Sequence, residues 1–134
     1  MAKLLDFRET YYEFSGKASD AARNLALAGI AVVWIFRIGE GSASRLPQPL
    51  IWAVCLFALA LALDLLHYSL AAVTWGTFHW LKEKAGASEE SKLTAPRWLN
   101  WIPILFWGFK IVSVIVGHAF LGRFLLGILF PTVG

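Results

Sequence analysis

The stretch LIWAVCLFALALAL, residues Leu50–Leu63, decides the fold because it contains neither a charged residue nor a turn-forming one. Two further apolar stretches accompany it: LALAGIAVVWIF at Leu25–Phe36, and Ile102–Phe130, which has single charges inside it. A helix needs roughly 20 residues to cross the ~30 Å core of a bilayer, so three crossings use about half of the chain. We therefore predict an all-α polytopic membrane protein with three transmembrane helices and little chain left for a soluble catalytic domain.

The composition agrees with a lipid environment, since 58% of the residues are hydrophobic and only 16% are charged. A formal net charge of +3 would suggest a nucleic-acid partner in a soluble protein. Here the basic residues flank the apolar stretches, where they act as topology signals and contacts to anionic lipid. We expect the lipid bilayer, and no nucleic acid, as a partner.

The whole chain is predicted to form one membrane domain. Its first span covers residues 21–38, and its second covers 49–80 with an extension to about residue 84. Residues 81–97 form a polar loop, and residues 98–131 form an interfacial turn followed by the third span.

The start of the third crossing decides how its charges are interpreted. A crossing that begins near Pro103 brings Arg123 to the outer interface, where an arginine is ordinary. A crossing that begins near Phe109 leaves Arg123 near the midplane, where a charge must find a partner. Both registers remain open at the level of sequence.

The segment before the first span has an amphipathic pattern. Leu4, Phe7, Tyr11 and Phe14 recur at spacings of three and four, with charged residues between them. We predict a short interfacial helix over residues 1–16 that lies on the membrane, with packing on a protein partner as the equal alternative. Ser15-Gly16 would allow a bend, and Ser19 or Asp20 would cap the next helix.

Small residues predict a packing face on the first span. Ala18, Ala22 and Ala26 repeat every four residues with Gly29 beside them, so another helix can approach this backbone closely. We favour a contact between copies of the chain. A second group, of aromatic residues expected at the membrane interface, consists of Trp75, Trp80, Trp98 and Trp101.

Positive residues are distributed asymmetrically about the spans. Most lie before the first span and between the second and third, whereas the other side has only Arg37 and Arg45. The positive-inside rule then predicts a multi-pass protein of the cytoplasmic (inner) membrane. Its N-terminus and residues 81–97 would be cytoplasmic, and its C-terminus would lie outside.

Five polar residues are expected within the membrane, and intramembrane polar residues often mark ion or proton paths. They are Asp64, His67, Lys110, His118 and Arg123. The structural alternative, which we place first, is that Asp64 pairs with Lys110 or hydrogen-bonds a neighbouring helix and holds the bundle in register. In a homo-oligomer, a ring of these residues could instead line a pore.

A haem site is a minor alternative. Two imidazoles at equal depth on facing helices can ligate one iron, and His67 and His118 form the only plausible pair. In size and span number the chain resembles the haem-carrying membrane anchor subunits of succinate dehydrogenase. None of their sequence motifs is present, so this resemblance covers architecture alone, and we expect no cofactor and no metal.

Motifs of catalysis are missing from the sequence, which has no glycine-rich phosphate loop, Cys/His metal cluster, nucleophile elbow or HExxH. We predict no enzymatic activity. The first functional hypothesis is a homo-oligomeric membrane assembly that forms a pore or perturbs the membrane. The second is a non-catalytic membrane anchor or accessory subunit that holds a larger cytoplasmic protein partner. Small membrane proteins of both kinds occur in bacterial stress and phage-defence operons, which gives context only.

Overall fold

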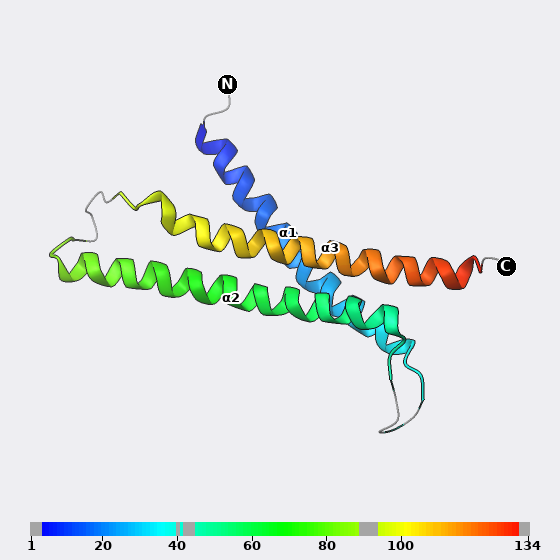
Figure 1. Ribbon diagram of the computed structural model, residues 1–134. Coiled ribbons are helices and arrows are strands. Elements are labelled where there is room, and N and C mark those ends of the chain that lie inside the picture. The colour runs from blue at the N-terminus through cyan, green and yellow to red at the C-terminus, as the bar shows by residue number, and fades with distance from the viewer. Residues whose placement is uncertain (1–3, 40, 42–44, 89–93, 132–134) are drawn as a thin grey trace.

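The computed structural model describes residues 4–39, 41, 45–88 and 94–131 (Figure 1). These residues form three long helices, α1 (Leu4–Ile35), α2 (Gln48–Lys84) and α3 (Trp101–Leu129), with a short 3₁₀ helix, η2 (Arg97–Asn100), before α3. Each long helix contains a segment that is long and apolar enough to cross a membrane. The predicted all-helical fold with three candidate spans is confirmed at that level.

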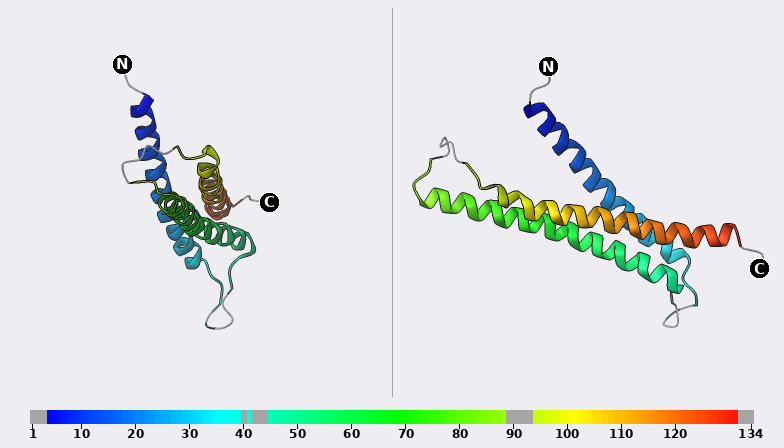
Figure 2. Two further views of the ribbon diagram at one scale, coloured as in Figure 1. Left: turned by 90° about the vertical axis from the view of Figure 1, so that its left-hand side faces the viewer. Right: turned by 45° about the horizontal axis from the view of Figure 1, so that its top comes forward.

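Helices α2 and α3 form an antiparallel hairpin, and α1 crosses the hairpin obliquely (Figures 1 and 2). Pro47 precedes α2 and Pro49 lies in its first turn, where a missing backbone N–H costs no helical hydrogen bond. At the other end, Gly86 has a φ of 87°, and the N–H of Ala87 bonds the carbonyl of Lys82. Such a left-handed glycine closes a helix by satisfying its last carbonyls.

Helix α1 continues without a break through Ser15 and Gly16, so the predicted bend there is wrong. The Ser15 hydroxyl donates to the carbonyl of Tyr12, and the Nζ of Lys17 lies 2.7 Å from Glu13 Oε1 across the expected break. Contacts of this spacing support a helix rather than end one. Residues 4–16 therefore extend the first span instead of forming a separate helix, and residues 1–3 of the predicted segment lie outside the described residues.

The centre of the bundle is an aromatic ring held between two glycines. Phe57 of α2 is fully buried, and a Cβ built on Gly29 of α1 would lie 2.5 Å from its ring. A Cβ on Gly117 of α3 would lie 2.7 Å from the same ring. Both positions require glycine because the three backbones meet around one phenyl group.

The predicted packing face of α1 lies against this core. Ala22, Ala26 and Gly29 are buried, and Ala18 is half-buried. Since α2 and α3 of the same chain cover these residues, a contact between copies has to use other surfaces. The core around Phe57 consists of Ala22, Ala26, Val33, Leu50, Ala53, Phe57, Ala60, Val114 and Leu121.

The register of the hairpin fixes relative depths along the bundle. Asp64 lies beside Lys110. Seven residues earlier in α2 and seven residues later in α3, Phe57 lies beside Gly117. Arg123 and Pro49 line one shallow groove, which places Arg123 level with the start of α2. An α2 that starts at the membrane interface would therefore put Arg123 at the interface as well, as in the crossing that begins near Pro103.

The connection from α2 to α3 is described only in part. Helix α2 occupies residues 81–84 of the expected loop, and residues 89–93 lie outside the described residues. Pro96 leads into η2, which packs against α3 and whose Leu99 is buried.

Candidate functional site: a charge cluster shared by three helices

Asp64 of α2 is the centre of a charge cluster that involves all three helices. Its Oδ1 lies 2.5 Å from Nζ of Lys110 on α3, and its Oδ2 lies 2.7 Å from Nε of Arg23 on α1. One carboxylate therefore accepts hydrogen bonds from two cations on two different helices. We use the name charge cluster for Arg23, Asp64 and Lys110 with their hydroxyl partners, Ser19 and Tyr68.

Lys110 is the most deeply placed member, with 1% of its side chain exposed. Its ammonium group donates to Asp64 and also to the hydroxyl of Ser19 on α1. The same Nζ lies 5.6 Å from the centroid of the Tyr68 ring, within the range of cation–π attraction. These contacts hold the Lys110 side chain in place, and its ammonium group has almost no contact with solvent.

Two hydroxyl groups complete the cluster. The Ser19 Oγ and Tyr68 OH atoms are 3.3 Å apart and share a hydrogen bond. The ring of Tyr68 also lies 5.7 Å from the guanidinium carbon of Arg23. Tyr68 is thus in contact with both cations, and its ring helps to offset the second positive charge.

A second carboxylate, Asp20, lies at the exposed edge of the charge cluster, so two acidic groups balance the two cations. Arg23, whose side chain is 39% exposed, reaches Asp20 at 3.8 Å as well as Asp64. In a low-dielectric interior, a buried charge is tolerated when it is paired and hydrogen-bonded. The cluster can therefore hold three helices in one register, and within one protomer its charged groups are already in contact with each other.

A cavity of about 220 Å³ adjoins the charge cluster one turn further along α2. His67 lies in its wall together with Tyr11 and Tyr12 of α1 and Ile104 and Trp107 of α3. Trp107 Nε1 donates to the Ser15 carbonyl at 3.2 Å, which closes one side of the cavity. Within the described part of the chain, Nδ1 of His67 is buried without a hydrogen-bond partner.

His118 lies at a different level of the bundle. Its ring contacts Phe57 with a centroid distance of 4.7 Å, and its Nδ1 pairs with the Val114 carbonyl at 2.9 Å. His67 is ten residues from Phe57 along α2, a rise of about 15 Å. The two histidines of one chain therefore cannot flank one iron, because axial ligands must share one depth. Among the described residues, no group of three His, Cys, Asp or Glu side chains could hold a metal ion.

The remaining predicted residues lie on the surface. Arg123 is exposed beside Phe120 and Phe124 in the groove near Pro49. The four tryptophans expected at the interface are exposed, and all belong to the end of the bundle where α2 leads into α3: Trp75, Trp80, Trp98 and Trp101. The structure therefore brings Asp64 and Lys110 together, places His67 one turn away, and separates His118 and Arg123 from them.

Sequence reasoning missed two members of the charge cluster. Arg23 was counted only among the basic residues that flank the apolar stretches, and Ser19 was interpreted as a helix cap, whereas Arg23 donates to Asp64 and Ser19 accepts from Lys110. Their spacing of four residues could have identified them, because residues four apart on a helix lie on the same face. Ser19 and Arg23 continue the small-residue face through Ala22 and Ala26, the face buried against α2 and α3.

Comparisons of this chain with protein-family models, with curated proteins and with solved structures give no match.

Proposed function

We propose that this protein is a non-enzymatic, multi-pass protein of the cytoplasmic membrane that acts as a homo-oligomeric assembly. The observation that carries the proposal is a mismatch of length. Helices α1 and α2 have 32 and 37 residues, about 48 and 55 Å, against a bilayer core of ~30 Å. The excess length bears exposed aromatic side chains, which favour protein contacts outside the hydrocarbon core.

The charge cluster supports this proposal by making each protomer a self-contained unit. Asp64 pairs with Arg23 and Lys110, and Asp20 beside Arg23 supplies the second negative charge, so no second chain is needed to neutralise the group. Of the five polar residues first considered for a pore lining, Asp64 and Lys110 are buried, and Arg123 is exposed near the start of α2. A membrane-perturbing assembly fits this arrangement better than a pore lined by Asp64.

The positive-inside rule assigns one end of the bundle to the cytoplasm. The N-terminal part of α1, the end of α2 and the start of α3 lie on one side of the charge cluster along the bundle. We place this end in the cytoplasm and the C-terminus outside. The interfacial placement of Leu4–Phe14 on lipid remains a competing proposal for that segment.

A membrane anchor for a larger protein is the second candidate function. The observation that favours it is the C-terminal end of α2, where Lys82 lies over the ring of Phe78 and Lys84 over the ring of Trp80. An exposed surface of cations and aromatic rings is suited to an acidic protein partner.

Native mass measurement of the detergent-purified protein tests the first proposal. We expect one defined multiple of the 14.9 kDa protomer, and release of small dyes from liposomes if the assembly perturbs membranes. A monomer at all concentrations would refute the homo-oligomer. Co-purification with one larger protein in stoichiometric amount would instead support the anchor.

A further inference from the structure

Arg123 of α3 is a cation without a protein partner in the part of the chain that the structure describes. Its side chain is exposed, and no hydrogen bond, ion pair or ring contact joins it to another described residue. Residues 97–131 contain no carboxylate, and neither do residues 45–63, which include the start of α2. The two helices around Arg123 therefore supply no counter-charge for it.

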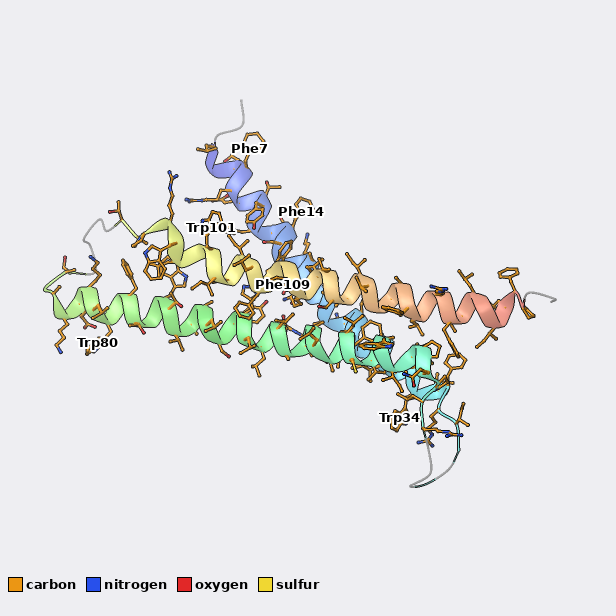
Figure 3. The ribbon with its side chains drawn as sticks, viewed as in Figure 1. Phe7, Phe14, Trp34, Trp80, Trp101 and Phe109 are labelled. Atoms are coloured by element: carbon orange, nitrogen blue, oxygen red, sulfur yellow. The ribbon has the colours of Figure 1, made fainter. Side chains whose placement is uncertain are left out.

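Arg37, at the same end of the bundle, has a contact within the chain. Its guanidinium carbon lies 5.5 Å from the ring centroid of Trp34, within the range of cation–π attraction. Figure 3 shows Trp34 at the end of the bundle where α2 starts, opposite Trp80. Arg37 is therefore a natural comparison for Arg123, because both are exposed arginines at one end of the molecule.

Arg123 belongs to the wall of a groove of about 530 Å³ between the start of α2 and the end of α3. The groove is lined by Pro49, Phe120, Arg123, Phe124, Gly127 and Ile128. Phe124 is held in place by Phe36 of α1, whose ring packs edge-on at a centroid distance of 5.4 Å. Phe120 and Ile128 remain 38% and 51% exposed. The groove is thus an apolar surface with a single cation in its wall.

The groove has free space on the outer side of Arg123. Phe120 lies about one turn nearer the centre of the bundle, and Gly127 about one turn nearer the end of α3. A Cβ built on Gly127 would meet nothing within 4 Å. Figure 1 shows α3 continuing past the start of α2 at this end. A ligand can therefore lie beside the guanidinium without displacing any part of the described bundle.

The proposed membrane setting determines which ligand suits this groove. The end of α3 is part of a candidate span and would face lipid. A charge in such a segment needs a partner or water, and the cost of leaving it without one rises with depth. A guanidinium binds phosphate oxygens through two parallel hydrogen bonds, and apolar side chains suit an acyl chain. An anionic phospholipid offers both groups in one molecule.

We propose that this groove binds one anionic phospholipid, with its phosphate on Arg123 and an acyl chain along Phe120 and Phe124. The headgroup would use the free space over Gly127. A zwitterionic phospholipid is the weaker ligand, because its own ammonium group competes with Arg123 for the phosphate. This inference rests on the proposed residence in a membrane and not on the proposed homo-oligomer.

Native mass spectrometry of the full chain in detergent tests the site, with phosphatidylglycerol and phosphatidylcholine of the same acyl chains as probes. We expect the parent to retain one phosphatidylglycerol per protomer in preference to phosphatidylcholine. Arg123→Gln should weaken this binding about tenfold, because a charge-assisted contact is lost. Arg37→Gln is the matched control, since it removes a charge at the same end but outside the groove, and it should bind as the parent does.

A second pair of variants tests the shape of the groove without changing any charge. Gly127→Leu fills the space beside Arg123, and we expect it to reduce the bound phosphatidylglycerol as Arg123→Gln does. A Cβ at Gly127 meets nothing within 4 Å, so the fold should be kept. Gly108→Leu is the matched control on the same helix, because a Cβ there also meets nothing and Gly108 is not part of the groove. The control should retain the lipid.

Thermal unfolding gives an independent measurement of the same contact. Added phosphatidylglycerol should raise the melting temperature of the detergent-purified parent, because a ligand stabilises the state that binds it. The melting temperature of Arg123→Gln should not respond to the lipid. Without added lipid, the two proteins should melt together, since Arg123 has no partner among the described residues.

The outcomes that would overturn the inference are distinguishable. Equal retention of phosphatidylglycerol by the parent, Arg123→Gln and Gly127→Leu would refute the site. Equal retention of both lipids by the parent would refute the preference for an anionic lipid. A chain that is released from phosphatidylglycerol vesicles by carbonate extraction would refute the membrane residence on which the inference rests. A chain that stays in the vesicles while the variants bind lipid as the parent does would refute the site alone.

Discussion

Asp64 is the side chain on which the stability of the bundle should depend most, because its one carboxylate contacts two cations. The variant Asp64→Asn would leave Lys110, which is 1% exposed, without a counter-charge, and Arg23 with Asp20 alone. Removing one partner of a buried ion pair costs about 3 to 5 kcal/mol. We expect a clear fall in the melting temperature of the detergent-purified protein, followed by circular dichroism at 222 nm.

Matched variants separate the charge effect from a general effect of mutation. Arg123→Gln changes an exposed charge and should alter the free energy of unfolding by less than about 0.5 kcal/mol. Asp64→Asn combined with Lys110→Met should recover part of the loss, because the deepest uncompensated charge is then removed. If Asp64→Asn melts at the same temperature as the parent, the charge cluster does not stabilise the fold.

The cluster could be foreseen from sequence only in part. Asp64 and Lys110 were recognisable as a pair because both are charges inside the predicted spans. Arg23 and Ser19 were not, because counting apolar residues gives the length of each span and not the vertical offset between spans. Their participation depends on how far α1 is shifted along α2, which only tertiary packing determines.

At the level of the helices, the packing of Phe57 between Gly29 and Gly117 makes a specific prediction. Gly29→Ala and Gly117→Ala each place a methyl group within 3 Å of a fully buried ring. Overpacking of this kind costs about 1 to 3 kcal/mol. Both variants should lower the melting temperature, although alanine is otherwise the better helix former.

Gly108→Ala provides the control on the same helix as Gly117. A Cβ at Gly108 would meet nothing within 4 Å, so only helix propensity should change. Its expected effect is a gain of about 0.5 to 1 kcal/mol. The prediction fails if Gly29→Ala and Gly117→Ala raise the melting temperature as Gly108→Ala should.

The helices themselves illustrate which patterns in a sequence are reliable. Long apolar stretches predicted three candidate spans correctly, because no other regular structure satisfies so many backbone groups in lipid. Ser15-Gly16 was a misleading break signal, since one glycine costs a long helix only about 1 kcal/mol. The neighbouring ion pair between Glu13 and Lys17 and the contact from Trp107 to Ser15 support the helix there.

The whole molecule has two chemically different ends, and their placement in the membrane can be measured. The N-terminal part of α1, Leu4–Phe14, and the end of α2 lie on one side of the charge cluster, whereas Arg45 follows α1 at the other end, where its N–H bonds the Ile38 carbonyl. In a Cys55→Ala background, we expect Glu9→Cys and Glu83→Cys to react with an impermeant maleimide only when the cytoplasmic face is accessible. Arg45→Cys should react in intact cells.

The comparison between these three sites tests the fold as well as the orientation. If all three sites are labelled from the sides opposite to those expected, the positive-inside assignment is reversed. The three-span bundle is still supported, because the two ends still lie on opposite sides of the membrane. If Glu83→Cys and Arg45→Cys react from the same side, α2 does not cross the bilayer. If α2 lay in water, the ion pair between Asp64 and Lys110 would contribute little to stability, because water screens paired charges. The labelling of Glu83 relative to Arg45 is therefore the measurement that decides whether the charge cluster works inside a membrane.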